Sequence, residues 1–185
     1  METLISIAIG IGLSAACGFR IFVPPLVMSM AALYGHLPLS ENFAWMGSYH
    51  ALIAFTAATL IEIAAYYVPW VDNLLDAVST PTAIAVGTFL TAALLPDTDP
   101  LLQWTVAVVA GGGSAGIIQT LTGMVRLSST AFTLGAGNGI VSTIEAVGSV
   151  FLSVLAVFAP VLAVGLVASG LILLWSKRFR KQQST

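Results

Sequence analysis

Charged side chains are scarce in this chain, and their scarcity excludes most classes of protein. Only 8% of the 185 residues are Asp, Glu, Lys or Arg, whereas 58% are hydrophobic and the mean hydropathy is +0.99. Because soluble domains carry charge on about 25% of their residues, this composition predicts an all-α transmembrane protein instead. The net charge is −2 and no basic stripe is present, so we expect no nucleic-acid partner.

The chain also lacks short motifs of common enzymes. It has no HExxH, CxxC or Walker sequence, so we expect no enzymatic activity, and the sequence implies no cofactor. Its one cysteine, Cys17, cannot form an internal disulfide. Although Ser14 to Cys17 loosely match a lipoprotein cleavage site, no Lys or Arg precedes them, so we predict that Cys17 packs inside a helix.

The longest hydrophobic element is Thr3 to Tyr34, 32 residues that contain a single charge, Arg20. A straight helix of that length would extend about 48 Å, which exceeds the roughly 30 Å of bilayer hydrocarbon. Pro24 and Pro25 follow Arg20 and free two backbone acceptors, which protein or water must satisfy. We therefore predict that this span is tilted or broken and forms one wall of an internal polar site.

Further apolar stretches bring the predicted number of spans to six. They are residues 51–68, 81–95, 101–125, 138–159 and 161–175. Residues 70–79 predict a short amphipathic helix at the membrane interface, and residues 127–137 predict a polar loop. Pro69 ends the second span, and Pro160 separates the last two. If Pro160 only kinks one long helix, the number of spans is five.

The two halves of the chain share a pattern of a long interrupted span, a medium span with one glutamate and a short span. Residues 1–96 and 97–176 therefore predict an inverted 3+3 repeat with broken first and fourth spans, an arrangement common in transporters. Four of the six Lys and Arg residues lie in the remaining segment, residues 177–185, which predicts a cytoplasmic C-terminal tail. With six spans the N-terminus is cytoplasmic as well.

Ionisable residues inside the predicted spans are the first candidates for a site. A charge at bilayer depth is costly and usually faces the interior of the bundle, so we predict that Arg20, Glu62 and Glu145 bind a solute. The alternative is a buried Arg–Glu pair that only holds two helices together. Arg126 stands at the end of its span and is predicted to reach towards the membrane interface as a structural residue. Pro24, Pro25, Pro69 and Pro160 are predicted to be structural too.

Glycine is concentrated in the middle of the fourth span, around Gly112, Gly113 and Ser114. These small residues favour close packing between the first and fourth spans. Alternatively, both spans unwind there and point a helix N-terminus at a bound anion, with Arg20 completing the site. Asn138, at the start of the fifth span, is predicted to cap that helix and to contribute to binding.

Metal binding is not predicted. Asp72 and Asp76 are four residues apart and share a face if they are helical, but two carboxylates are a weak metal signal. We interpret them as the solvated face of an interfacial helix. His36 and His50 are too far apart to suggest a metal site, so we expect them on the surface.

Parts of the sequence resemble a family of small bacterial integral-membrane proteins described only as a domain of unknown function. The resemblance lies in Gly18 to Arg20, in Glu62 with residues 69–76 (PWVDNLLD), and in residues 137–145 (GNGIVSTIE). In that family the last string often continues with Asp, where this chain has Ala146, and an acidic residue is common at the position of Ala65 or Tyr66. The resemblance implies a bacterial inner-membrane protein and no particular activity.

Together these features predict a small secondary transporter or channel-like permease for a small anion or a proton-coupled polar solute. The hypothesis requires the guanidinium of Arg20 to lie in a hydrated interior. A homodimer in contact with membrane lipids is expected, because 185 residues give few helices to enclose a cavity. The alternative is a non-transporting scaffold, assembly factor or lipid-binding protein. An enzyme acting on lipid through Asp72, Asp76 and Glu62 is a third hypothesis.

Overall fold

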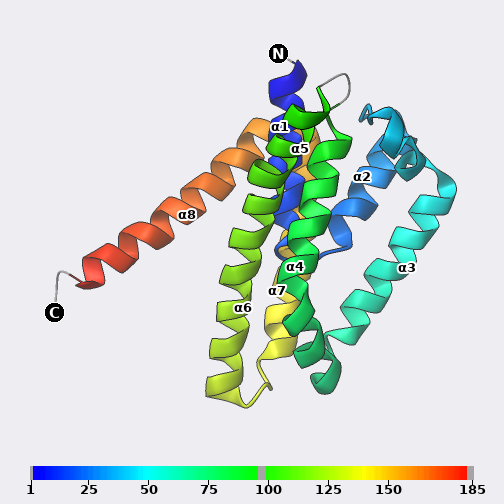
Figure 1. Ribbon diagram of the computed structural model, residues 1–185. Coiled ribbons are helices and arrows are strands. Elements are labelled where there is room, and N and C mark those ends of the chain that lie inside the picture. The colour runs from blue at the N-terminus through cyan, green and yellow to red at the C-terminus, as the bar shows by residue number, and fades with distance from the viewer. Residues whose placement is uncertain (1, 96–98, 183–185) are drawn as a thin grey trace.

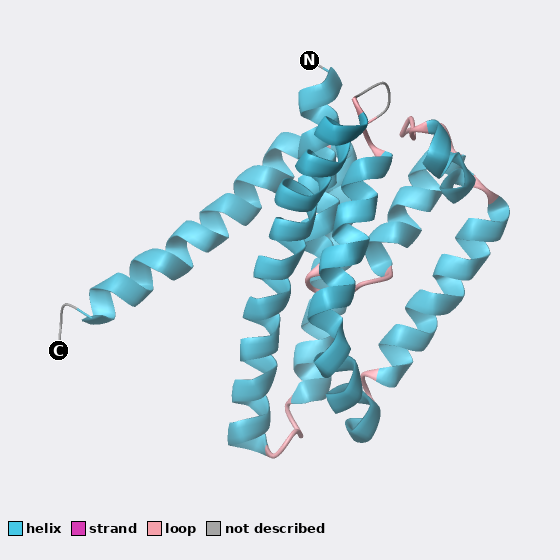
Figure 2. Cartoon of the chain, in the orientation of Figure 1, coloured by secondary structure: helices cyan, strands magenta, loops and turns pink. Residues whose placement is uncertain are grey.

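The computed structural model describes residues 2–95 and 99–182, and all regular elements within these ranges are helices (Figures 1 and 2), which confirms the predicted all-α class. The 3-10 helix is η1 and the π-helix is η2. In chain order the elements are α1 (Glu2–Cys17), α2 (Val23–Leu33), η1 (Glu41–Gly47), α3 (Tyr49–Ala65), α4 (Pro69–Ala93), α5 (Pro100–Val106), η2 (Ala107–Gly112), α6 (Gly113–Thr133), α7 (Asn138–Phe158) and α8 (Pro160–Gln182).

Several of these helices are long and apolar enough to cross a membrane. Within the described ranges they are Leu74–Ala93, Pro100–Thr133 and Asn138–Phe158. A fourth candidate is the pair η1 and α3, which are bent by 68° relative to each other. The predicted count of six spans and the inverted repeat stay predictions.

Helices α1 and α2 form a hairpin that turns inside the bundle (Figure 1). The hairpin turns at residues 18–22, and Pro24 and Pro25 occupy the first turn of α2, where a missing amide hydrogen costs nothing. Glu2 at the start of α1 and His36 just after α2 line the same cavity, so both open ends of the hairpin lie at one end of the bundle. The predicted break in the element Thr3 to Tyr34 is confirmed. After the break, however, the chain returns to the end of the bundle where α1 begins.

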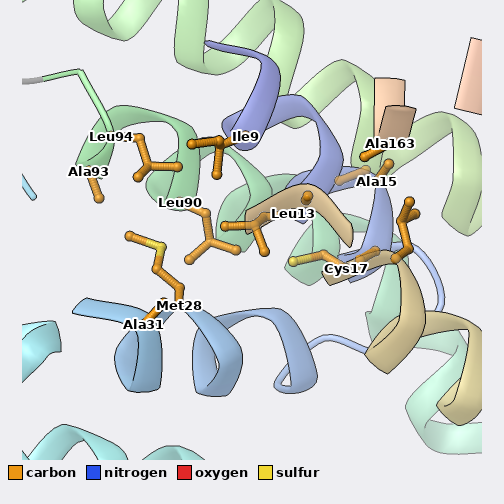
Figure 3. Packing of buried hydrophobic residues seen from close by; sticks show 14 of the residues in the cluster. Ile9, Leu13, Ala15, Cys17, Met28, Ala31, Leu90, Ala93, Leu94 and Ala163 are labelled. Carbon is orange, nitrogen blue, oxygen red and sulfur yellow. The ribbon is translucent and has the colours of Figure 1, made fainter. Parts of the chain in front are cut away.

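Helix α1 is the centre of the fold and packs against α4, α6, α7 and α8. Its last turns are built from small residues, and Ser14 to Cys17 are fully buried. Figure 3 shows Leu13 and Cys17 of α1 beside Leu90 of α4 and Met28 of α2. Cys17 is therefore a buried packing residue, as predicted.

Glycines on α1 and directly after it allow close contacts with neighbouring helices. A Cβ atom on Gly12 would lie 2.6 Å from the Cβ of Ala156 on α7, and one on Gly18 would lie 2.6 Å from the Cβ of Ile118 on α6. Such separations are shorter than real carbon–carbon contacts allow. Small residues therefore let the helices of this bundle approach closely, as is common in membranes.

Two predicted boundaries are wrong because helices continue through them. Residues 70–79 are not a separate interfacial helix, since α4 runs without a break through Pro81 to Ala93. A proline removes one backbone hydrogen bond, and packing of α4 on α1 and η2 maintains the helix. The predicted loop at 127–137 is helical up to Thr133, and the turn that follows contains Leu134 and Gly135 with positive φ.

The predicted interruption of the fourth span is also absent. From Pro100 to Thr133 the chain is one helical path, in which Gly111 and Gly112 end the π-helical segment η2 and Gly113 begins α6. By contrast, the predicted break at Pro160 is confirmed, because α7 ends at Phe158 and α8 starts at Pro160. Figure 1 shows α8 diverging from α6 and α7 towards its C-terminal end, and its helix continues into the predicted tail.

We predict that Gly12→Ala lowers the free energy of unfolding by about 1–3 kcal/mol, because its methyl group would overlap Ala156. Gly123→Ala on α6 is the matched control, since a Cβ there meets no atom within 4 Å. The control should be neutral or stabilising by up to about 1 kcal/mol. Unfolding of both variants in mixed detergent micelles measures the difference, and equal stability of the two would contradict the packing described here.

Candidate functional site

Charged side chains from five parts of the chain meet at the hairpin turn. Arg20 lies in the turn, Glu62 on α3, Asp76 on α4, Arg126 on α6 and Glu145 on α7. Tyr66, just after α3, packs among them. We call these six residues the charge cluster. The structure therefore brings together Arg20, Glu62 and Glu145, which the sequence marked as candidates.

Side chains from three neighbouring helices bond to the backbone of the hairpin turn and of the last turn of α1. The Glu62 carboxylate accepts hydrogen bonds from the backbone amides of Ile21 at 2.8 Å and Phe22 at 3.0 Å. The hydroxyl of Thr122 donates to the carbonyl oxygen of Gly18 at 2.9 Å. On α7, Ser149 donates to the carbonyl oxygen of Ala16 at 3.0 Å. Broken backbone at membrane depth needs such partners, because lipid offers none.

Glu62 provides the negative charge at the start of α2. The prolines of α2 follow directly, and Phe22 at the N-cap position offers no side-chain cap of its own. Because a helix N-terminus carries partial positive charge, a carboxylate there is favourable. A carboxylate from α3 thus occupies the position that an external anion would take.

Arg20 is fully buried, with no exposed side-chain surface. Its Nη2 donates to the carbonyl oxygen of Ser142 at 2.8 Å and lies 3.8 Å from Oε2 of Glu145. Its guanidinium carbon lies 4.0 Å from the centre of the Tyr66 ring, a cation–π contact. Nε and Nη1 of Arg20 have no hydrogen-bond partner among the described residues.

Arg126 and Glu145 form the tightest ion pair of the cluster. Nε of Arg126 donates to both carboxylate oxygens, at 3.0 and 3.1 Å, and Nη2 also donates to Oε2. Nη2 further donates to the hydroxyl of Ser142 at 3.2 Å, and Nη1 lies 3.7 Å from Oδ1 of Asp76. The guanidinium carbon of Arg126 lies 4.1 Å from the Tyr66 ring centre.

The prediction that Arg126 reaches towards the membrane interface is wrong, because its side chain is only 3% exposed. The reason is the length of α6, which continues beyond Arg126 to Thr133. Arg126 precedes the last residue of α6 by as many positions as Glu145 follows Asn138, the first residue of α7. This pair was not predicted, because the spacing becomes visible only once the end of α6 is known. No pattern in the sequence indicated that Tyr66 would pack against the two arginines.

The other predicted binding residues lie apart from the charge cluster. Asn138 is the first residue of α7 rather than its cap, and its side chain bonds to Thr130 of α6 at 3.0 Å. Gly112 packs on α4, where an added Cβ would lie 2.6 Å from Oγ1 of Thr88. The backbone is helical at Gly112, so no helix N-terminus is presented there. The close-packing interpretation of these glycines fits this geometry.

The prediction that the chain lacks enzyme motifs is incomplete, because residues 112–116 match the pattern G-x-S-x-G, which in hydrolases places a nucleophilic serine on a strained strand-to-helix turn. Here the motif lies inside a continuous helix. The hydroxyl of Ser114 donates to the carbonyl oxygen of Gly111 at 2.9 Å and of Ile11 at 3.4 Å. The structural context of a nucleophile elbow is therefore missing. Nothing within 4 Å would meet a Cβ at Gly113.

The weak metal candidates do not assemble into a metal-binding group within the described residues. Among these, no three His, Cys, Asp or Glu side chains come together in a suitable arrangement. Asp76 pairs with Arg126, and the side chain of Asp72 lies outside the described part of the structure. His50 is exposed, and His36 packs edge-on against Phe158 with ring centres 5.9 Å apart.

Beside the charge cluster lies an apolar groove of about 400 Å³ between α6, α7 and α8, which we call the lateral groove. Glu145 is the one charged residue among those that line it. Phe19, the neighbour of Arg20, also lines the groove. The remaining lining residues are Ile118, Leu121, Thr122, Val125, Val141, Ile144, Leu152, Leu166, Val167, Gly170 and Leu171.

A family model described as a domain of unknown function, DUF4126, matches residues 7–179 and so includes the whole charge cluster. The chain belongs to the DUF4126 family. The resemblance inferred from the sequence strings is thereby confirmed. Neither a curated protein nor a solved structure matches this DUF4126 chain significantly.

We predict that Arg126→Met or Glu145→Leu alone lowers the free energy of unfolding of this DUF4126 protein by about 3–5 kcal/mol, because each removes the closest partner of a buried charge. The double variant should lose much less than the sum of the two single losses. Unfolding in mixed micelles measures all three variants. Strictly additive losses would show that the two side chains do not act as a pair.

Proposed function

We propose that this DUF4126 protein is a small permease that carries an anion together with a proton. The charge cluster is its binding site, in a state closed by the protein's own carboxylates. The observation that carries the proposal is the start of α2, where Glu62 holds the amides of Ile21 and Phe22 inside the bundle. A half-helix with its positive end at an internal site is a recurrent way to bind anions in transporters.

Arg20 adds a second group suited to an anion. Its side chain is buried, yet Nε and Nη1 have no hydrogen-bond partner among the described residues. Leaving donors of a buried cation unpaired is costly, and an entering anion would satisfy them. The start of α2 and the guanidinium of Arg20 lie near each other, and both favour an anion as the ligand.

The formal charges of the cluster support coupling to protons. Arg20 and Arg126 give two positive charges, whereas Glu62, Asp76 and Glu145 give three negative charges when ionised. A further anion would add negative charge to a site of low polarisability, which is unfavourable. Protonation of Glu62 or Glu145 offsets that charge and releases the helix start or the guanidinium groups for the anion.

The inverted 3+3 repeat, with six membrane elements, is part of the proposal. Each half gives one arginine and one glutamate to the cluster, Arg20 with Glu62 and Arg126 with Glu145. The first element of the first half is the α1–α2 hairpin, whereas its counterpart α5–α6 is continuous. Glu2 and Leu95 line one cavity, so in this state the first half begins and ends at the same end of the bundle, and an inverted arrangement requires the α1–α2 element to cross the membrane in another state.

We further propose the bacterial inner membrane as the location, with a cytoplasmic C-terminus, because the basic residues follow the last apolar stretch. A homodimer is proposed as the working unit. Large exposed apolar side chains on α6, α7 and α8, such as Ile117, Phe151 and Leu166, support contact with lipid or with a second copy.

The second candidate function is a non-transporting membrane scaffold or assembly factor. The transport hypothesis requires the Arg20 guanidinium to be hydrated. Its side chain is completely buried, and this burial favours the scaffold function. In this alternative the ion pairs only hold α1, α6 and α7 together. The two functions differ in whether any flux depends on the cluster.

We predict that purified protein in proteoliposomes moves protons inward when an anion gradient is imposed, and that Glu62→Gln reduces this flux at least about tenfold. The amide oxygen of the introduced glutamine can still accept a hydrogen bond from one backbone amide, so the hairpin should stay folded. Arg20→Ala should abolish the flux. Glu41→Gln is the matched control, because Glu41 is an exposed carboxylate outside the cluster.

Loss of flux counts only for variants that keep the wild-type unfolding midpoint in detergent. Wild-type flux in both folded cluster variants would refute the proposal. Absence of flux in the wild-type protein, with each of several inorganic and organic anions, would favour the scaffold function.

A further inference from the structure

The lateral groove lies on the outside of the bundle, beside helices that are candidates for membrane spans. Its walls come from α6, α7 and α8, and the first two belong to helices long and apolar enough to span a membrane. Side chains along these walls are exposed and apolar, including Val125, Ile144 and Leu166. In a membrane the solvent that fills such a groove is lipid.

The inner wall of the groove reaches the charge cluster. Glu145 lines the groove, and the same carboxylate binds Arg126 and lies 3.8 Å from Arg20. Phe19 lines the groove as well and is the backbone neighbour of Arg20. The side chain of Glu145 therefore borders the lateral groove and also lies beside both guanidinium groups.

We infer that the lateral groove binds an anionic lipid taken from the bilayer, with an acyl chain along α6, α7 and α8 and the acidic headgroup at Arg126 and Arg20. This inference rests on the proposed function and names the class of anion that the cluster accepts. The headgroup takes the place of the Glu145 carboxylate, which leaves with a proton. The number of negative charges beside the two arginines is then unchanged.

Charge distinguishes an anionic lipid from the other possible occupants. A second copy of the chain would cover the groove with apolar side chains and leave Nε and Nη1 of Arg20 unpaired. A zwitterionic headgroup brings a positive charge towards two arginines. A phosphate with no cationic group offers bidentate acceptors to both guanidiniums and repels neither. The volume of about 400 Å³ is within the usual range for a ligand pocket.

Two glycines of α8 provide a matched pair of variants. Gly170 lines the groove, whereas Gly165 is on the same helix and does not line it. A Cβ at either position meets nothing within 4 Å, so a new side chain starts in open space at both positions. Gly170→Leu fills the groove, and Gly165→Leu adds the same side chain outside it.

The experiment titrates delipidated protein in detergent with phosphatidic acid or phosphatidylcholine of identical acyl chains, and native mass spectrometry counts bound lipid. We expect phosphatidic acid to bind about tenfold more tightly than phosphatidylcholine. Gly170→Leu should weaken binding of phosphatidic acid about tenfold, while Gly165→Leu should equal the wild type. Folded Glu145→Gln protein should show a larger preference for phosphatidic acid, because the neutral amide no longer offsets the charges of Arg126 and Arg20.

Equal binding of the two lipids overturns the inference, as does equal binding by the two glycine variants. This assay requires no transport, so its outcome is separate from that of the flux assay. A headgroup preference without any anion flux supports the lipid site and contradicts the permease. Flux of a water-soluble anion without lipid binding supports the permease and overturns the lipid site.

Discussion

The structure depends on satisfying the backbone of a turn placed inside an apolar bundle. Between α1 and α2 the chain leaves helical geometry at residues 18–22, where water is not available to pair its polar groups. Glu62 and Thr122 supply such partners in the turn, and Ser149 bonds to the last turn of α1, so three different helices contribute. Each of these helices must therefore keep its position relative to the hairpin, and the fold is organised around that requirement.

The electrostatics of the cluster follow from the same turn. Glu62 compensates the positive end of α2, so it is not available to neutralise an arginine fully. Arg20 then relies on Glu145, which Arg126 also binds, and Tyr66 offers its ring to both guanidiniums. Glu145 is thus shared by two cations, and Asp76 also pairs with Arg126, so the charges of the cluster are coupled to one another.

The sequence predicted features that depend on composition and on single strong signals. The helical class, the break before Pro24 and the burial of Cys17 follow from hydropathy, proline chemistry and residue size. The candidates Arg20, Glu62 and Glu145 were also recognisable, because an isolated charge in an apolar stretch is costly in a membrane and usually faces the interior of the bundle.

Other features depend on tertiary contacts that a linear pattern does not contain. Pro81 lies inside α4 because packing outweighs one lost hydrogen bond. Polar residues after Arg126 suggested a loop, but α6 continues to Thr133, and this extension buries Arg126. The return of α2 to the end where α1 begins could not be inferred either, since a broken span and a hairpin have the same hydropathy.

The hairpin can be tested most directly by labelling intact cells or oriented vesicles with a membrane-impermeant maleimide. Single cysteines replace Glu2, Glu41 and Leu134, all exposed, in a Cys17→Ala background. If the α1–α2 hairpin turns inside the membrane, Glu2→Cys and Glu41→Cys react from the same side, and Leu134→Cys reacts from the opposite side. Reaction of Glu2→Cys and Glu41→Cys from opposite sides would contradict the account.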